Sequence, residues 1–263
     1  MSTTGTSRPF AVVTGASSGI GRELANVLAE NGYDLLLCAE DAGVADAAVA
    51  LTAAGTPAEP VQVDLATYDG VEDLVAAIDN RQVDVVALNA GIGVGGPFLE
   101  TDLDADLELI QLNVASVVHL TKRVLPGMVS AGRGRLLYTA SLASVIPGPY
   151  YATYSASRAF VLNFAQAVRH ELADTGVTVT ALLPGPTDTE FFDRAGMTDT
   201  RVGHMSKDDP AEVARDGFEA LMAGKDHVVA GSARNRVMFS SKGLPEPAKA
   251  AVHARLTEPE EQE

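Results

Sequence analysis

The sequence predicts an α/β fold, a doubly wound parallel sheet flanked by helices on both faces. Short apolar segments alternate with amphipathic ones, without composition breaks, long linkers or internal repeats, as in consecutive βαβ units. The first apolar segment runs into a glycine-rich turn and then a helical pattern. A length of 263 residues suits one α/β domain, so we expect a single domain over residues 1–263.

Seven segments have the length and apolar character of strands. They are Phe10–Thr14, Leu35–Ala39, Pro60–Asp64, Val83–Leu88, Arg135–Ala140, Val177–Leu183 and His227–Ala230. A first helix is expected between Gly21 and Asn31. Six further helices are expected at about 44–53, 70–78, 104–131, 151–173, 210–222 and 247–256. Right-handed crossovers bring the carboxyl ends of parallel strands to one edge of the sheet, where ligands bind.

The helix expected over 104–131 carries one long apolar stripe. Thr101 and Asp104 occupy the positions of a capping box. Its apolar stripe consists of Leu103, Leu107, Ile110, Val114, Val117, Thr121 and Val124. We expect this helix to pack on the sheet.

The glycines after the first strand predict a phosphate-binding turn. A helix N-terminus offers free backbone N–H groups and a positive dipole end to a diphosphate. Gly15 permits the tight turn, Gly19 the approach of the ligand and Gly21 close packing of helix on strand. Their spacing, Gly-x-x-x-Gly-x-Gly, differs from the common Gly-x-Gly-x-x-Gly fingerprint. A glycine-rich connection without a ligand is the alternative.

Glu40 follows the second strand, where a carboxylate can accept hydrogen bonds from the adenosine ribose of a dinucleotide. The same charge would repel the extra phosphate of NADP, so the sequence favours NAD over NADP. The alternative is that Glu40 and Asp41 are solvated charges at the start of a loop.

Ser141, Tyr154 and Arg158 form a second candidate cluster, with Asn113 upstream. Tyr154 and Arg158 are four residues apart in a helical pattern, so they project from one face and the cation favours the phenolate. A Ser141 hydroxyl could hold a substrate oxygen while the tyrosine exchanges a proton with it. A helical Tyr/Arg pair used only for surface packing is the alternative.

Composition excludes several classes of function. The formal charge of −16 opposes binding to nucleic acids and to anionic membranes, and no segment has the length and apolarity of a membrane span or signal peptide. We therefore expect a cytoplasmic protein. Cys38 is the single cysteine and reads as a core residue. The five histidines, His119, His170, His204, His227 and His253, show no ligand spacing, so no metal site is expected.

Five motifs, in order, resemble the short-chain dehydrogenase/reductase family from about Phe10 to Asp226. They are Thr14–Gly21 as the Thr-Gly-x-x-x-Gly-x-Gly turn, Asn89-Ala90-Gly91, Asn113, Ser141 with Tyr154, and Pro184-Gly185 with Thr189. The resemblance implies a Rossmann-type fold and an NAD(P)-dependent oxidoreductase, with hydride transfer between nicotinamide and a carbonyl or secondary alcohol.

The resemblance also implies residue roles. Tyr154 would be the general acid/base, Ser141 would orient the reacting oxygen, and Asn113 would hold a water of the proton relay. The cofactor contacts implied by the motifs and strand ends are Gly15, Ser17, Ser18, Gly19, Ile20, Gly21, Glu40, Asp64, Leu65, Asn89, Ala90, Gly91, Tyr154, Arg158, Pro184, Gly185, Thr187 and Thr189. It further implies a homodimer or homotetramer built through the two long helices.

Arg158 departs from the family pattern, which has lysine at this position of Tyr-x-x-x-Lys. Arginine keeps the charge but does not readily release a proton. The departure leaves two hypotheses open: an oxidoreductase, and a catalytically impaired dinucleotide-binding sensor or scaffold.

The remaining segments give expectations about the substrate and the chain ends. A substrate loop is expected over 186–208. Apolar residues predict a pocket for an apolar small molecule, or ordinary loop packing: Val145, Ile146, Pro147, Phe191, Phe192, Met197 and Met205. Residues 231–257 depart from the family's usual ending. The tails 1–8 and 258–263 are expected to be disordered.

Overall fold

The computed structural model describes residues 8–240, 243 and 245–259. Within them, one sheet of seven strands has the order β3-β2-β1-β4-β5-β6-β7, and each neighbouring pair is parallel. The strands are β1 (Phe10–Thr14), β2 (Asp34–Ala39), β3 (Ala58–Gln62), β4 (Val85–Leu88), β5 (Gly134–Thr139), β6 (Val177–Leu183) and β7 (His227–Val229). The doubly wound α/β fold is therefore confirmed.

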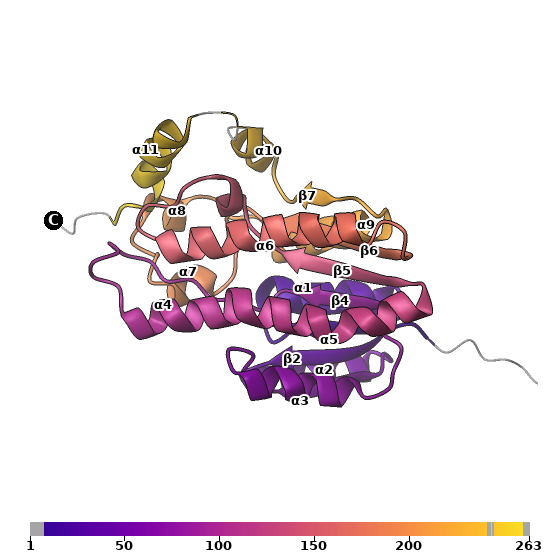
Figure 1. Ribbon diagram of the computed structural model, residues 1–263. Helices are drawn as coiled ribbons and strands as arrows, with labels where there is room; N and C mark the ends of the chain where they lie inside the picture. The colour runs from indigo at the N-terminus through magenta and orange to yellow at the C-terminus, as the bar shows by residue number, and fades with distance from the viewer. Residues whose placement is uncertain (1–7, 241–242, 244, 260–263) are drawn as a thin grey trace, which may run out of the picture.

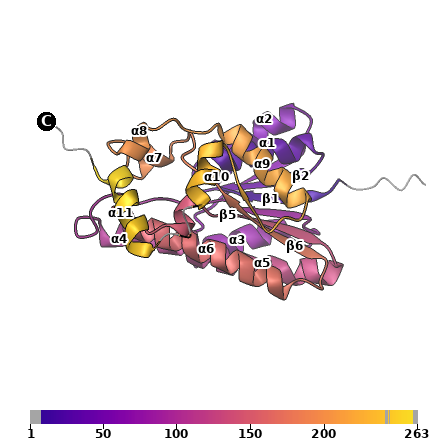
Figure 2. The same ribbon diagram turned by 90° about the horizontal axis from the view of Figure 1, so that it is seen from above.

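Helices cover both faces of the sheet (Figures 1 and 2). One layer contains α1 (Gly19–Glu30), α2 (Gly43–Ala53) and α9 (Pro210–Met222), and the other contains α3 (Tyr68–Ile78), α5 (Ser116–Ala131) and α6 (Ala152–Glu171). In β1, Ala11 and Val13 face the first layer, while Phe10 and Val12 face the second. All five residues of β1 are buried, as in a parallel strand covered on both sides.

The edge strand β3 and the buried cysteine show how the chain fits this plan. β3 spans Ala58–Gln62, two residues earlier than expected, so Asp64 lies after the end of the strand. Pro60 is tolerated there because an edge strand needs fewer ladder donors.

Cys38 is fully buried in β2, and burial raises the pKa of its thiol to about 12. That thiol stays protonated and acts as a core side chain.

The helix predicted over 104–131 is present as one unbroken helical run, but the expectation that its apolar stripe packs on the sheet is only partly right. The structure has α4 (Leu103–Ile110), a π-helical segment η1 (Gln111–Ala115) and then α5. A π turn holds an extra residue, so it rotates the apolar face of the helix before it relative to the helix after it. Leu103, Leu107 and Ile110 are consequently 69%, 48% and 39% exposed, whereas Val117 is buried on the sheet.

The predicted capping box at Thr101 and Asp104 is also wrong. Asp102 is the N-cap of α4, and its carboxylate accepts hydrogen bonds from the backbone N–H groups of Asp104 at 2.8 Å and Ala105 at 3.2 Å. Thr101 instead donates to the carboxylate of Asp106 at 2.9 Å. Asparagine and aspartate outrank threonine as N-caps, which explains the displacement by one residue.

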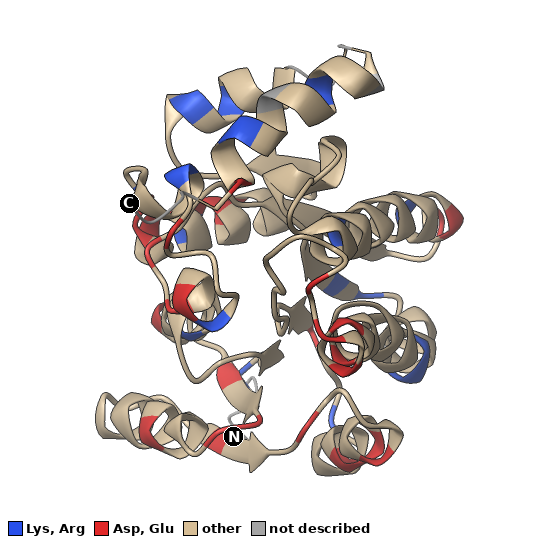
Figure 3. Ribbon diagram, turned by 90° about the vertical axis from the view of Figure 1, so that its left-hand side faces the viewer, with Lys and Arg blue, Asp and Glu red and all other residues tan. Residues whose placement is uncertain are grey.

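After β6, the described residues form four short or terminal α-helices besides α9. They are α7 (Phe191–Arg194), α8 (Arg201–His204), α10 (Ala233–Ser240) and α11 (Glu246–Thr257). Of these, only α11 is expected from the sequence. In Figure 3, α10 and α11 lie at the top of the view, and they carry the basic residues Arg234, Arg236, Lys249 and Arg255. Among the described residues, no helix combines the length and apolarity needed to cross a bilayer.

Parts of both expected tails are ordered. Arg8 donates to the carbonyl oxygen of Gly32 at 3.0 Å and pairs with Asp34 at 3.1 Å. Glu258 accepts a hydrogen bond from the Tyr150 hydroxyl at 2.9 Å. The rest of the predicted tails, 1–7 and 260–263, lies outside the described residues, so the structure corrects the prediction only at its inner ends.

Candidate active site

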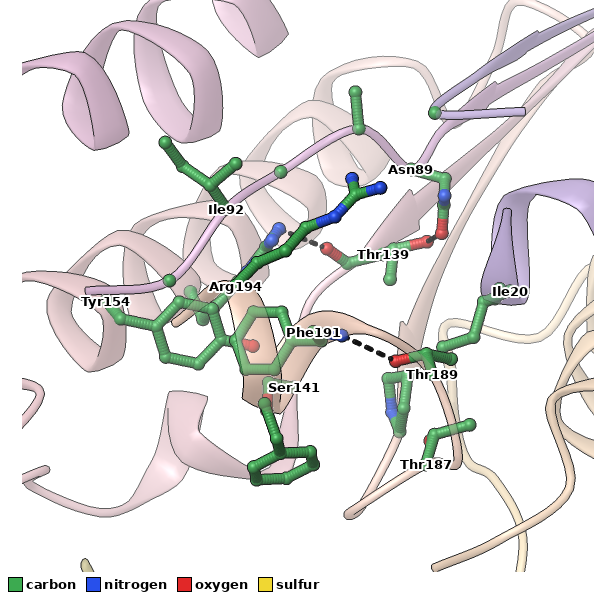
Figure 4. Close-up of a pocket in the computed structure, with 18 of the residues that line it drawn as sticks. Ile20, Asn89, Ile92, Thr139, Ser141, Tyr154, Thr187, Thr189, Phe191 and Arg194 are labelled. Carbon is green, nitrogen blue, oxygen red and sulfur yellow. Dashed lines mark hydrogen bonds between the residues drawn. The ribbon is translucent and has the colours of Figure 1, made fainter. Parts of the chain in front are cut away.

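One cavity of about 260 Å³ opens at the carboxyl ends of the strands and is lined by most of the sequence-predicted residues (Figure 4). All of the candidate catalytic and cofactor-binding residues line it except Gly21 and Asn113. Those two lie directly behind its wall, in contact with lining residues. The strand-end rule thus brings together residues from position 15 to position 189 of the chain.

The glycine turn between β1 and α1 has the geometry that the sequence predicts. Gly15 and Gly19 have φ angles of +67° and +54°, a region that disfavours other residues. A Cβ on Gly21 would overlap the carbonyl oxygen of Gly15, and a Cβ on Gly19 would lie 2.9 Å from the Thr189 methyl carbon. The Ser18 N-cap makes no side-chain hydrogen bond to the helix. The start of α1 is therefore shaped to receive an anion.

Three carboxylates border the cavity after strands β2 and β3. Asp41 accepts hydrogen bonds from the Ser17 hydroxyl at 2.7 Å and the Gly43 N–H at 2.9 Å, which ties the glycine turn to β2. Glu40 lines the cavity with an exposed side chain. Asp64 uses one carboxylate oxygen to accept from the Ala66 N–H at 2.8 Å. Asp41 was not among the predicted site residues.

Two threonines at strand ends fix the Asn89-Ala90-Gly91 segment. The Thr14 hydroxyl accepts hydrogen bonds from the N–H groups of Asn89 at 2.9 Å and Ala90 at 3.0 Å. The Thr139 hydroxyl donates to the side-chain oxygen of Asn89 at 3.0 Å. Sequence reasoning missed both positioning roles, although Thr14 closes a predicted strand and Thr139 is the last residue but one of another, at the edge where ligands bind.

Asn113 anchors the same segment from the π-helical turn. Its side-chain oxygen accepts from the Ile92 N–H at 3.0 Å, and its amide donates to the Ile92 carbonyl at 2.9 Å and to the Ser157 hydroxyl at 3.1 Å. The side chain is fully buried. Both of its amide hydrogens are thus used by the protein, and its place in a proton relay stays a prediction.

Ser141 presents its hydroxyl at the end of β5. The Ser141 oxygen accepts a hydrogen bond from the Ala143 N–H at 3.1 Å, which leaves the hydroxyl hydrogen free to donate. Ser144 accepts from the Ser141 N–H at 3.2 Å and donates to the Arg158 carbonyl at 2.9 Å. Ser144 therefore couples the loop after β5 to helix α6, which carries the tyrosine.

Tyr154 and Arg158 lie one turn apart on α6 and both line the cavity. The guanidinium carbon of Arg158 lies 5.2 Å from the centre of the Tyr154 ring. Tyr154 extends between Ser141 and Phe191 (Figure 4), with the Phe191 ring centre 5.1 Å away. A phenol, a serine hydroxyl and a cation therefore share one side of the cavity.

Arg158 is only 5% exposed, and few of its N–H groups donate hydrogen bonds to other described residues. Its Nη1 donates to the Thr139 carbonyl at 3.0 Å, while its buried Nε has no hydrogen-bond partner among the described residues. Its Nη2 lies against Gly91, where any side chain would collide with it. A buried guanidinium needs acceptors, and the hydroxyl groups of a nucleotide ribose would supply them.

The expected substrate loop encloses the other half of the cavity, but the predicted apolar wall is only partly right. Phe191, Phe192 and Met197 line the cavity, whereas Val145, Ile146, Pro147 and Met205 do not. The segment 145–147 instead lines a separate surface groove and faces α11. Val202, Met238 and Leu256 complete the apolar wall, and no sequence signal identified them.

Tyr151 and His253 form a polar pair in this apolar half. The Tyr151 hydroxyl lies 2.6 Å from His253 Nε2, and His253 Nδ1 lies 2.9 Å from the Pro147 carbonyl oxygen. Burial lowers the pKa of His253, an effect that the hydrogen bond to Pro147 opposes. Burial, with the nearby Tyr154, raises the pKa of Tyr151 far above its usual value. Both groups are therefore neutral near pH 7.

The lowered pKa of His253 predicts a loss of stability in mild acid. The unfolded chain binds a proton at His253 near a pKa of about 6.5, but the folded chain binds it only at lower pH, so stability falls as pH falls through this window. We expect the melting temperature of the wild type to drop more steeply than that of His253→Gln between about pH 7.5 and pH 5. Equal slopes in thermal melts would contradict this.

Among the described residues, no group of three or more His, Cys, Asp or Glu side chains is placed to hold a metal ion. The residues that line the cavity have the features of a nicotinamide-dependent oxidoreductase: a glycine turn before a helix, unused guanidinium donors and a phenol with a serine hydroxyl. This is the class of protein that the fold and site define.

The family model of the short chain dehydrogenase matches residues 9–199, and the chain belongs to that family. A 3-oxoacyl-[acyl-carrier-protein] reductase of Synechocystis is 37% identical over 179 residues, 66% of this chain and 72% of that protein. The mouse dehydrogenase/reductase SDR family member 7B is 32% identical over 231 residues, 83% of this chain and 72% of that protein.

A solved structure agrees with this assignment. The short-chain dehydrogenase from Sphingobium yanoikuyae in complex with NADPH superposes with a TM-score of 0.79 at 28% identity, covering 84% of this chain and 87% of that chain. The resemblance of the five sequence motifs to this family is thus confirmed, and a nicotinamide dinucleotide is the supported cofactor class.

Proposed function

We propose that the protein transfers a hydride between a nicotinamide dinucleotide and the carbonyl or secondary alcohol of an apolar small molecule, with Tyr154 as general acid and base. The observation that carries the proposal is a single cavity lined by the glycine turn, Ser141, Tyr154 and Arg158. Its other half is walled by Phe191, Phe192 and Met197, which suits an apolar substrate.

The residues divide the work of the reaction. Ser141 donates its free hydroxyl hydrogen to the reacting oxygen, and Tyr154 gives that oxygen a proton in reduction and takes it back in oxidation. Arg158 stabilises the phenolate by its charge and offers its unused donors to the ribose. When bound, the reduced nucleotide supplies the hydride. Since a guanidinium holds its proton, Tyr154 is reprotonated from water in the cavity.

The test is to titrate purified protein with NADH and NADPH and then to assay a panel of ketones and secondary alcohols at 340 nm, the absorbance band of the reduced nicotinamide. Binding of a nucleotide and Tyr154-dependent turnover of a ketone are the expected results. Failure to bind either nucleotide would overturn the proposal.

We propose NAD rather than NADP as the preferred cofactor. Glu40 and Asp41 line the end of the cavity beside β2, whereas Arg158 and Arg194, the arginines among its described lining residues, belong to α6 and α7. A ribose phosphate at this end would meet carboxylates. We expect NADH to bind about tenfold more tightly than NADPH, a difference of about 1.4 kcal/mol. Glu40→Gln should lower the ratio of the NADPH and NADH dissociation constants. The control Glu30→Gln, at the far end of α1, should leave this ratio unchanged. An unchanged ratio in Glu40→Gln would contradict the assignment.

A second function is favoured by Arg158 itself, whose Nη1 is held by the Thr139 carbonyl. In this alternative the protein binds the dinucleotide as a sensor or scaffold without turnover. The Arg158→Lys variant discriminates between the two functions. If the wild type does not reduce ketones but Arg158→Lys does, the sensor is supported. If the wild type reduces ketones, the enzyme is supported.

We also propose a homodimer or homotetramer. Leu103, Leu107 and Ile110 form an exposed apolar row on α4, and Phe160 of α6 is 39% exposed. Apolar rows of this kind mark interaction surfaces. Light scattering after gel filtration should give at least twice the monomer mass of 27.3 kDa. A monomer at micromolar concentration would contradict this assembly.

A further inference from the structure

The C-terminal helix α11 is fastened to the loop that precedes the catalytic tyrosine. Lys249, His253 and Thr257 lie one above another on one face of α11 and are 6%, 7% and 1% exposed. Each donates a hydrogen bond to a backbone carbonyl of the loop. The acceptors are Val145 at 3.3 Å, Pro147 at 2.9 Å and Pro149 at 2.8 Å.

The spacing of this contact follows from backbone geometry. Residues four apart in an α-helix lie on one face, about 6 Å apart along the axis. Here every fourth side chain of α11 meets every second carbonyl of the loop. The loop ends at Tyr150, whose φ of +63° is rare for a residue with a side chain. Contacts from α11 hold this strained backbone in place.

The middle contact continues into the cavity. A carbonyl oxygen can only accept, so the Nδ1 of His253 carries the hydrogen that bonds to Pro147. In the neutral ring, Nε2 then has a lone pair and no hydrogen. The Tyr151 hydroxyl, 2.6 Å from Nε2, must therefore donate its hydrogen to His253. The lone pairs of the Tyr151 oxygen remain as hydrogen-bond acceptors on a cavity-lining residue.

Tyr151 lines the same cavity as Ser141 and Tyr154 but cannot replace them. The ring centres of Tyr151 and Tyr154 are 5.8 Å apart. Because its own hydrogen is committed to His253, Tyr151 cannot donate to a carbonyl oxygen as Tyr154 and Ser141 can. Around it the wall is apolar, with Phe192, Met197 and Leu256, so a polar substrate group has few other partners there.

We propose that Tyr151, oriented by His253, is a specificity-determining residue that accepts a hydrogen bond from a hydroxyl or N–H group which the substrate carries near its reacting carbonyl. The proposal rests on the proposed function for the position of the reacting carbonyl, and it narrows the substrate class to hydroxy or amino ketones and the corresponding diols or amino alcohols. His253 is a positioning residue, since it acts through Tyr151.

The size of the effect follows from the bonding of Tyr151. A substrate analogue is rejected strongly when it leaves a buried polar group of the site without any hydrogen-bond partner. The Tyr151 hydroxyl, however, keeps its hydrogen bond to His253 with any substrate. Only an acceptor is left unused when the substrate lacks a donor. One neutral hydrogen bond corresponds to roughly a threefold to tenfold difference in affinity.

The experiment compares acetophenone with its α-hydroxy derivative, two ketones with one carbon skeleton. Calorimetry on the nucleotide-loaded protein should give roughly threefold to tenfold tighter binding of the hydroxy ketone. In Tyr151→Phe, and in His253→Phe, the ratio of the two dissociation constants should fall towards one. When turnover is measurable, the difference should appear in KM more than in kcat.

Thr257→Val is the matched control, because it removes another contact between α11 and the loop without touching the cavity. It should keep the wild-type ratio, and thermal melts should show that all variants are folded. Equal binding of the two ketones by the wild type would overturn the proposal, as would a ratio that falls in Thr257→Val as far as in Tyr151→Phe. If neither nucleotide binds, the proposed function fails, while the same two titrations on the free protein still decide the role of Tyr151.

Discussion

Replacing Tyr154 with phenylalanine is expected to lower kcat for ketone reduction by roughly 10²- to 10⁴-fold, the usual contribution of a positioned acid or base. The substitution removes only the hydroxyl. The ring keeps its packing against Phe191 at 5.1 Å and Tyr151 at 5.8 Å, so the fold and the cavity should persist. Initial rates at saturating nucleotide measure the effect.

The nucleotide affinity separates a chemical role from a binding role. Tyr154→Phe should bind nucleotide nearly as well as the wild type, because the glycine turn and the donors of Arg158 are unchanged. Tyr68→Phe is the matched control, since Tyr68 is 71% exposed on α3, away from the cavity, and it should keep the full rate. A Tyr154→Phe protein with the wild-type rate would remove the tyrosine from the chemistry and with it the proposed mechanism.

The fold could be predicted from the sequence because a parallel sheet imposes simple demands. Strands such as β1 are buried on both faces, so they appear as short apolar runs, and the helices between them show one apolar face. The same geometry explains the predicted cofactor residues. Gly15, Asn89 and Ser141 come just after strands, and all three line one cavity, because the carboxyl ends of parallel strands share an edge.

The π-helical segment could not be predicted from periodicity. The residues before and after it both follow a helical repeat, and an apolar pattern does not show an inserted residue. The predicted stripe therefore joined exposed Leu103 and Leu107 to buried Val117. The inserted residue has a structural consequence: Asn113 lies in this segment, and its side chain bonds to the backbone of Ile92.

Part of the apolar half of the cavity could not be predicted from the sequence, for a different reason. Tyr151 and His253 are 102 residues apart, and no local pattern links them. A histidine without ligand spacing near the end of the chain gives no sign that it reaches the cavity. Met238 and Leu256 could not be predicted for the same reason, because the contacts of α10 and α11 depend on how the chain returns over the loop after β5. Tertiary packing of this kind has no signature in spacing or composition.

Replacing Gly21 with alanine is expected to weaken nucleotide binding roughly tenfold to a hundredfold and to lower the melting temperature. The added Cβ would overlap the Gly15 carbonyl oxygen and crowd the Asn89 side-chain nitrogen. The first of these is backbone, which cannot swing aside, so α1 must move away from β1. Overpacking of this kind costs about 1–3 kcal/mol, and the moved atoms are those that form the phosphate-binding turn.

Gly127→Ala is the matched control for this substitution. Gly127 lies inside α5 and a Cβ there would meet no atom within 4 Å, so alanine should stabilise the helix by about 0.5–1 kcal/mol. Opposite signs in the two melts would show that crowding, and not loss of glycine, weakens the turn. The nucleotide titration then tests the site. If Gly21→Ala bound both NADH and NADPH with wild-type affinity, the nucleotide would bind away from the start of α1, and the cavity would not be the cofactor site.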